Sequence, residues 1–213
     1  MEPSSLSPGP YEAVNLLIDQ YMTEAHFCAP AVVVSYNAAT QSATVQPTLM
    51  RKYNSPTGAD LPAVLLPQIS NVPVVFPATA TAWLRLPIAA GDLVMLHFSD
   101  RSLDAWWATN GAAPLDPKIP HKFVLADAIA VPGLRPGQAA IAAKGAATSV
   151  ELACGILWLE LMASGQVKLT NGTVDVIQAL STFATTVSSA TNVGQIAGAA
   201  VILEAALAPF AGL

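Results

Sequence analysis

The chain is organised around residues 91–134, GDLVMLHFSDRSLDAWWATNGAAPLDPKIPHKFVLADAIAVPGL. An apolar strand at 93–98 is followed at once by a charged segment at 99–104 and then by two adjacent tryptophans. A loop punctuated by prolines leads to a short apolar run that stops at Val131-Pro132-Gly133-Leu134. Because charged and aromatic side chains are concentrated here, this stretch is the first place to look for a functional site.

The composition limits the classes of protein. With 213 residues, 53 % of them hydrophobic, the chain can bury a core, and at about 150 residues per domain its length fits one or two domains. Charged residues are only 11 %, against about 25 % in an average soluble protein, so we expect much apolar surface to lie between subunits. The net charge of −5 provides no basic face for a nucleic-acid backbone, and we expect no nucleic-acid partner.

Two cysteines, Cys28 and Cys154, lie far apart and have no metal-ligand spacing. We expect buried free thiols, with a disulfide as the alternative. The first ten residues lack the basic segment and long apolar run of a secretory signal, which predicts folding in a reducing cytoplasm.

Residues 10–27 show helical spacing of apolar side chains, with acidic and amide side chains on the other face. The apolar stripe consists of Val14, Leu17, Ile18, Tyr21, Met22 and Ala25. We expect this leading helix to pack on its own domain; the alternative is docking on a partner.

From residue 31 the apolar period changes to two, which is typical of strands. Residues 31–49 predict a hairpin, and further strands are expected at 61–66, 67–74, 83–86 and 93–98. Five or six short strands without helix-length insertions indicate a small antiparallel barrel, and an OB-type barrel fits the size best.

After residue 136 the pattern changes to short strand-like pieces separated by the turns Ser164-Gly165 and Asn171-Gly172. Such pieces cannot bury both faces alone, so we expect copies of the chain to complete them as a short intertwined trimeric β-prism or β-helix.

The last segment has helical spacing and predicts one interrupted helix or a helical hairpin. A membrane-active tail is the alternative to a packed helix, but the Glu204 carboxylate would cost about 2.5–3.5 kcal/mol at the centre of a bilayer. The candidates for packing between chains are Phe183, Val187, Ile196, Leu203 and Leu207.

The search for chemistry gives few candidates. Asp100, Asp104 and Asp116 lie close in sequence, and paired carboxylates can cleave glycosides. Arg101 between Asp100 and Asp104 is explained more simply by an ion-pair and capping cluster. No nucleophile motif or phosphate loop is found, and the histidines at 26, 97 and 121 are isolated. We therefore expect no enzyme, no cofactor and no metal site.

Three motifs carry a resemblance to a known family. They are LPIAAGDLVMLHFSDRSLDAW at 86–106, PQISNVPV at 67–74, and a closing motif with His121, the pair Asp127-Ala128 and IAVPGL at 129–134. Together, in this order, they resemble the phage baseplate central-spike family, whose members begin with an OB domain. The resemblance covers about residues 31–134.

The resemblance implies a homotrimer in the virion, at the tip of a contractile tail. Its OB domains would form a collar against the tail hub protein, and its C-terminal part would extend toward the host envelope as a spike. Longer family members end in a β-helix with a histidine-bound metal apex. No histidine follows His121 here, so we expect a short spike whose helical end bundles as a trimer or receives a separate tip protein.

The implied organisation has four parts: an N-terminal arm and helix at 1–29, an OB-fold domain at 30–135, a β-prism or β-helix segment at 136–178 and a helical segment at 179–213. The corner after strand 93–98 is expected to serve trimer assembly. Its candidate residues are Asp100, Arg101, Asp104, Trp106, Trp107 and Asp127.

Two other classes of function stay open. One is a monomeric OB module that binds oligosaccharide or single-stranded nucleic acid, although the acidic balance does not favour a basic, aromatic groove. Trp106 and Trp107 could stack on such a ligand, but burial in a core or an interface is the simpler expectation. The other class is an envelope-degrading enzyme that uses Asp100 or Asp104.

Overall fold

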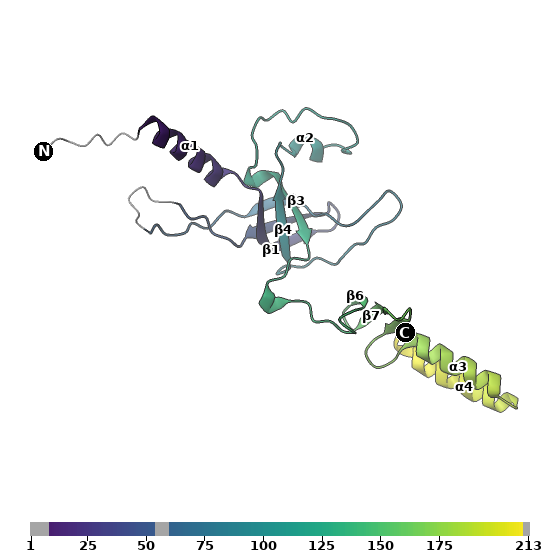
Figure 1. Cartoon of the computed structure of the whole chain (residues 1–213). Helices are drawn as coiled ribbons and strands as arrows, with labels where there is room; N and C mark the ends of the chain where they lie inside the picture. Colours follow the sequence, from purple (N-terminus) through teal and green to yellow (C-terminus); the bar gives the residue numbers. More distant parts are fainter. Residues whose placement is uncertain (1–8, 54–59, 211–213) are drawn as a thin grey trace. The chain divides into compact units, whose positions relative to one another are not determined.

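The computed structural model describes residues 9–53 and 60–210, and its contacts divide the chain into two units, residues 1–139 and 140–213. Figure 1 shows the elements of each unit along the chain. The first unit holds the leading helix α1 (Pro10–Glu24) and a five-stranded sheet. The second holds a three-stranded sheet and two helices.

The five-stranded sheet is antiparallel, in the order β3-β2-β1-β4-β5. Beyond β3, Val74 forms a parallel bridge with Ala130 of β5, and the Val75 N–H donates to the Ala130 carbonyl at 2.8 Å. The sheet therefore curls until its two outer strands meet, giving the neighbour cycle 1-2-3-5-4 of an OB-like barrel, as the sequence predicted. The strands are β1 (Cys28–Asn37), β2 (Ser42–Pro47), β3 (Ile69–Pro73), β4 (Leu93–Phe98) and β5 (Ala128–Pro132).

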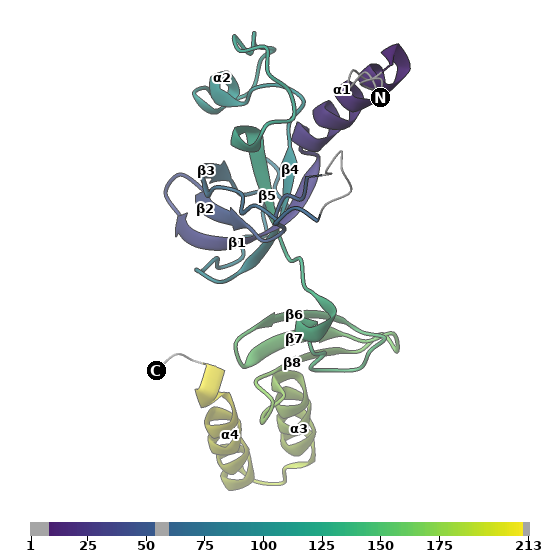
Figure 2. The same ribbon diagram turned by 90° about the vertical axis from the view of Figure 1, so that its left-hand side faces the viewer.

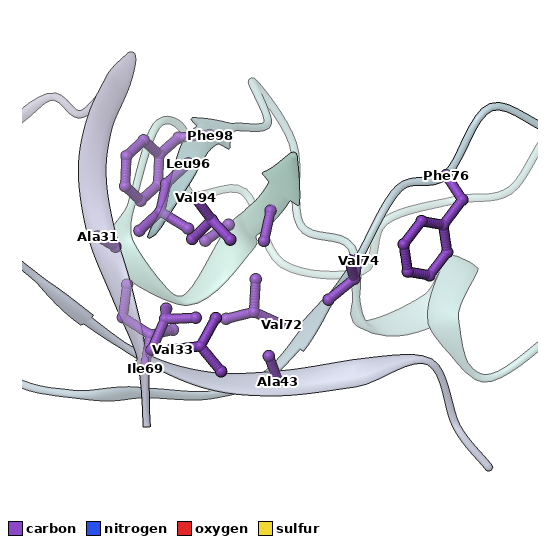
Figure 3. Close-up of a cluster of buried hydrophobic side chains, with 13 residues drawn as sticks. Ala31, Val33, Ala43, Ile69, Val72, Val74, Phe76, Val94, Leu96 and Phe98 are labelled. Atoms are coloured by element: carbon purple, nitrogen blue, oxygen red, sulfur yellow. The ribbon is translucent and has the colours of Figure 1, made fainter. Parts of the chain in front are cut away.

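The core lies on the inner face of this barrel. Alternate residues of each strand point inward, so Val94, Leu96 and Phe98 of β4 are buried while His97 is exposed. Figure 3 shows these three side chains across from Val33 and Val72. The other buried members are Ala31, Ala43, Val45, Ile69, Val74, Phe76, Ala128 and Ala130.

The prediction of strands at 61–66 and 83–86 is wrong. Arg51 bridges Val64, and Ala78 bridges Trp83, but the segments otherwise form no ladder. Pro62 interrupts the first segment and Pro87 directly follows the second, and a proline has no N–H to donate to a neighbouring strand. Residues 60–68 and 74–92, on either side of β3, are therefore loops with isolated bridges.

The expectation that α1 packs on its own domain is also wrong. Pro10 begins the helix, and the Glu12 carboxylate accepts from the Gly9 N–H at 3.1 Å. No residue of the helix is buried, and its apolar stripe is exposed. Within the described residues, the helix end is tied to the barrel by Glu24, which pairs with Arg51 at 2.9 Å. Periodicity predicted the stripe but not what covers it, and docking on a partner stays a prediction.

The second unit begins with an antiparallel meander of β6 (Val150–Cys154), β7 (Leu157–Leu161) and β8 (Val167–Thr170), shown in Figure 2. Gly155 and Gly165 turn the chain between these strands with φ of 59° and 82°, where glycine is favoured. Consecutive antiparallel strands are not the coils of a β-helix. An intertwined trimer stays a prediction.

The helical segment is a hairpin of α3 (Val176–Ser189) and α4 (Val193–Leu207), which Figures 1 and 2 show side by side. The Asp175 side chain caps α3 by accepting from the Gln178 N–H, and Asn192 caps α4 by accepting from the Gln195 N–H, both at 3.0 Å. Of the two forms that the sequence allowed, the two capped starts select the hairpin.

Four short helical pieces complete the described chain. The helix α2 (Asp104–Trp107) follows β4, and 3₁₀ turns lie at Leu125–Asp127, Gly137–Ala139 and Ala208–Phe210.

Both cysteines are free, and both are exposed, so the expectation of buried thiols is wrong. Cys28 is the first residue of β1 and Cys154 the last residue of β6, where the strand ends lie outside the packed interior.

Leu96→Ala should lower the free energy of unfolding of the barrel by about 2–5 kcal/mol, because a fully buried leucine leaves a cavity. Denaturant unfolding measures this. The matched control is Leu84→Ala at an exposed position, which should change it by less than about 0.5 kcal/mol. Equal losses in both variants would contradict the placement of the core.

Candidate functional site

The corner after β4 is held by one buried carboxylate, Asp127, which is 2 % exposed. Its Oδ1 accepts from the Leu103 N–H at 2.9 Å, and its carbonyl oxygen accepts from the Ser99 N–H at 2.9 Å. Asp127 thus fixes the segment that leaves β4 against the segment that enters β5. A buried carboxylate needs such partners, because an unpaired one is costly.

The second carboxylate oxygen of Asp127 faces a histidine. His121 Nε2 lies 2.6 Å from Asp127 Oδ2, and the imidazole is partly exposed to solvent. The two atoms are not aligned as a hydrogen bond, so the contact is an ion pair when the ring is protonated. The sequence predicted an isolated histidine at 121, whereas the structure places it beside Asp127, another residue of the closing motif.

The chain that leaves α1 also reaches this corner. The His26 N–H donates to the Phe123 carbonyl at 2.8 Å, and the Phe98 N–H donates to the Phe27 carbonyl at 3.1 Å. The rings of Phe27 and Phe123 lie 5.0 Å apart. The corner therefore joins three segments: the exit of α1, the end of β4 and the loop before β5.

The predicted ion-pair cluster is smaller than expected. Arg101 Nη1 lies 3.2 Å from Asp100 Oδ2 and also donates to the Asp100 carbonyl at 2.6 Å, and both side chains are exposed. Asp104 begins α2, and among the described residues it makes no ion pair with Arg101. The structure thus brings together two of the three predicted charges, and an exposed pair adds little stability.

The two tryptophans lie on the surface. The ring centroids of Trp106 and Trp107 are 6.3 Å apart. Both side chains are exposed, so the prediction that they are buried in the core of this chain is wrong. Burial in an interface between chains stays a prediction.

A groove of about 470 Å³ lies between β3 and α2. Trp107 and Asp104 line it on one side, Asn71 and Pro73 on the other, and Leu125 also lines it. Asp104 is the one ionisable group in this lining. A glycosidase needs two carboxylates flanking the bond, so this groove does not contain the pair.

The remaining acidic candidate is also explained by an ion pair. Asp116 lies 3.3 Å from Lys118 in an exposed loop. Across residues 9–53 and 60–210, no cluster of three histidine, cysteine or acidic side chains has a geometry for a metal ion.

A second polar cluster joins α1 to the loop after β2. Arg51 donates to Glu24 at 2.9 Å, to the Tyr53 hydroxyl at 3.3 Å and to His26 Nε2 at 2.8 Å. Because a guanidinium can only donate, this last contact requires the ring nitrogen to be unprotonated. Burial, and then the charge of Arg51, lowers the pKa of His26 below its ordinary value of 6.5. No local sequence signal predicts this contact, since 25 residues separate the pair.

The fold and the corner define an OB-like structural module. Residues 29–133 match the family model described as the phage protein Gp138 N-terminal domain, a span that runs from β1 to just beyond β5. The match supports a phage structural protein and therefore a place in the virion. No curated protein matches the chain. The second unit lies outside the matched residues.

Asp127→Ala should lower the free energy of unfolding by about 1–3 kcal/mol, because the Leu103 N–H loses its acceptor at a buried site. Asp127→Asn keeps the Oδ1 acceptor and should lower the free energy of unfolding by less than Asp127→Ala does. Denaturant unfolding measures both, with Asp116→Ala at an exposed pair as the control. If Asp116→Ala and Asp127→Ala lowered the free energy of unfolding by the same amount, Asp127 would not be the residue that holds this corner together.

The junction of α1 should weaken in mild acid. Since the pKa of His26 is lowered on folding, the unfolded chain binds the proton more readily. The contribution of this cluster is therefore complete above about pH 6.5 and is lost as the pH falls from there through the folded pKa. NMR titration of the His26 ring should give a midpoint below 6.5. His26→Asn should remove this part of the pH dependence of thermal unfolding; a midpoint above 6.5 would refute the assignment.

Proposed function

We propose that this chain is a homotrimeric central spike of a contractile-tail baseplate, which docks on the tail hub and helps to penetrate the host envelope. The match of the barrel to a phage protein domain supports a place in a phage particle. The observation that carries the proposal is the open apolar face of the sheet β6–β8.

One face of this sheet is polar and is already covered by the chain itself. Glu160 is 2 % exposed, and its carboxylate accepts from the Ala146 N–H at 2.9 Å and from the Ser149 hydroxyl at 2.8 Å. These bonds, led by that from Ala146, lower the pKa of Glu160, so the carboxylate stays ionised. Beside it, Glu151 Oε1 accepts from the Gly145 N–H at 2.5 Å.

The cover over this polar face is closely fitted. A Cβ at Gly145 would overlap the Glu160 carboxylate, so a larger residue there would displace this side chain. The ammonium groups of Lys144 and Lys168 lie 5.3 Å and 5.9 Å from the centre of the Trp158 ring. No second chain is needed to complete this face.

The opposite face is apolar and open. Successive side chains of a strand point to opposite faces of the sheet. The residues next to Glu160, and those paired with them on β6 and β8, therefore share the face opposite to Glu160, and this face is apolar. Leu152 is 53 % exposed, and the central Leu161 is flanked by Val150 and Val167. The full set is Val150, Leu152, Cys154, Leu157, Leu159, Leu161, Val167 and Leu169.

A second copy of the chain is the partner that this face fits best. Burying one such side chain stabilises by about 1.5–3 kcal/mol, so three faces meeting on an axis would form a core. The outer edges of β6 and β8 carry backbone groups that other strands can pair with. In such a spike, force along the tail axis passes through strands shared by three chains. This task requires no catalytic turnover.

The double variant Leu152→Asp, Leu161→Asp should abolish trimers, because two carboxylates would be desolvated in each copy of the interface. In sedimentation, the wild-type chain should run at three times its 22.0 kDa mass and the variant at one. The control is Ile141→Asp, an apolar residue of the same unit that is 76 % exposed and lies outside the sheet face; it should stay trimeric. A wild-type monomer at micromolar concentration would refute the proposal.

A further inference from the structure

We propose that the α3–α4 hairpin inserts into a lipid bilayer with residues 190–192 leading. The inference rests on the proposed function, in which the C-terminal end of the chain meets the host envelope. The hairpin is the element that makes contact, and its target is the hydrocarbon region of a membrane.

Charge is almost absent from the hairpin. Between residues 176 and 210, Glu204 is the one charged side chain, and Asp175 lies just before α3. At 1.5 Å per residue, Glu204 lies about 16 Å along α4 from Val193, and Asp175 about 21 Å along α3 from Ser189. The hydrocarbon of one leaflet is about 15 Å deep. The hairpin can therefore enter one leaflet while both carboxylates stay at the headgroup level, which avoids the cost of a charge at the bilayer centre.

Five of the six hydroxyls of α3 donate hydrogen bonds within the helix itself. Thr182, Thr185 and Thr186 each donate to the carbonyl four residues earlier, at 2.8–2.9 Å. Ser188 and Ser189 donate to the Thr185 carbonyl at 2.8 Å and 3.0 Å. In hydrocarbon, where no water is present, each unsatisfied polar group would cost several kcal/mol. These hydroxyls accordingly present little obstacle to insertion.

Several polar groups of the turn that would lead the insertion also bond within the hairpin. The Thr191 N–H and its hydroxyl both reach Gln195 Oε1, at 2.7 Å and 3.1 Å. The Asn192 side chain caps the start of α4. The turn carries no charged group, so its insertion requires no ion to be desolvated.

The surface of α4 fits lipid. Residues Val193–Phe210 are long and apolar enough to cross a membrane, by length and composition, and only 6 % of this segment is buried. A helix of the core would be mostly buried. Apolar side chains lie exposed around it, with Val201 65 % exposed, and a helix that is apolar all round is typical of a membrane or a large core. A groove of about 550 Å³ lies between the helices, and Phe183 and Leu203 line it together with polar side chains such as Gln178 and Thr182.

Flotation of the full chain with vesicles of phosphatidylethanolamine and phosphatidylglycerol tests the inference. The wild-type chain should float. Ile196→Glu places a carboxylate in the first turn of α4 and should weaken partitioning by about 100-fold. The matched control, Ile141→Glu, changes an apolar residue that is exposed but outside the hairpin, and should float like the wild type. If circular dichroism shows that Ile196→Glu loses helix, Val193→Glu at the exposed tip replaces it.

The depth of insertion can be measured directly. In a Cys28→Ser, Cys154→Ser background, a fluorescent label on Ala190→Cys at the tip should be quenched strongly by lipids brominated on their acyl chains. The same label on Gln178→Cys, near the base of α3, should be quenched weakly. Equal quenching at the two positions would overturn tip-first insertion.

The outcomes separate the inference from the proposed function. Trimers that do not float would overturn the lipid target and leave the spike proposal standing. A chain that floats but sediments as a monomer would support the lipid target and overturn the trimer. Loss of trimers by Ile196→Glu in the absence of lipid would show that the hairpin packs against other copies, and would overturn the inference.

Discussion

Both sheets of this protein depend on one constraint: successive side chains of a strand point to opposite faces, so a sheet buries one face and leaves the other open. In the barrel, the buried face is the apolar one, with Val33, Val45 and Leu96 inside. In the sheet β6–β8, the chain covers the polar face around Glu160 and leaves the apolar face open. The barrel buries its apolar face in one copy, whereas most apolar side chains of the sheet β6–β8 are exposed.

The parts of the fold that the sequence predicted are those that depend on local periodicity. The period of two located the hairpin β1–β2 and the strand β4, and the spacing of apolar residues located α1 and the terminal helices. Apolar residues also suggested strands at 61–66 and 83–86, but Pro62 removes a backbone donor from the first segment and Pro87 directly follows the second. Periodicity likewise found the stripe of α1 without saying what covers it.

The corner could not be predicted in the same way, because its contacts join residues distant in sequence. Asp127 accepts from Leu103, 24 residues away, and Arg51 reaches His26 across 25 residues. Spacing arguments instead selected Arg101 with its two neighbouring aspartates, of which only Asp100 forms a pair. The resemblance named Asp127 as part of a motif, and in the structure Asp127 fixes the segment that leaves β4 against the segment that enters β5.

The cover on the polar face of the second sheet bears on the order of folding. Residues 144–149 lie just before β6, and the Glu160 carboxylate that they enclose is 14 residues from Ala146. The meander β6–β8 likewise pairs only consecutive strands. Closing short loops costs little entropy, and a fold of local contacts forms faster than a barrel whose strand β1 pairs with the distant β4. We therefore expect the sheet β6–β8 to fold faster than the barrel, which shortens the time during which its apolar segments are exposed as unfolded chain.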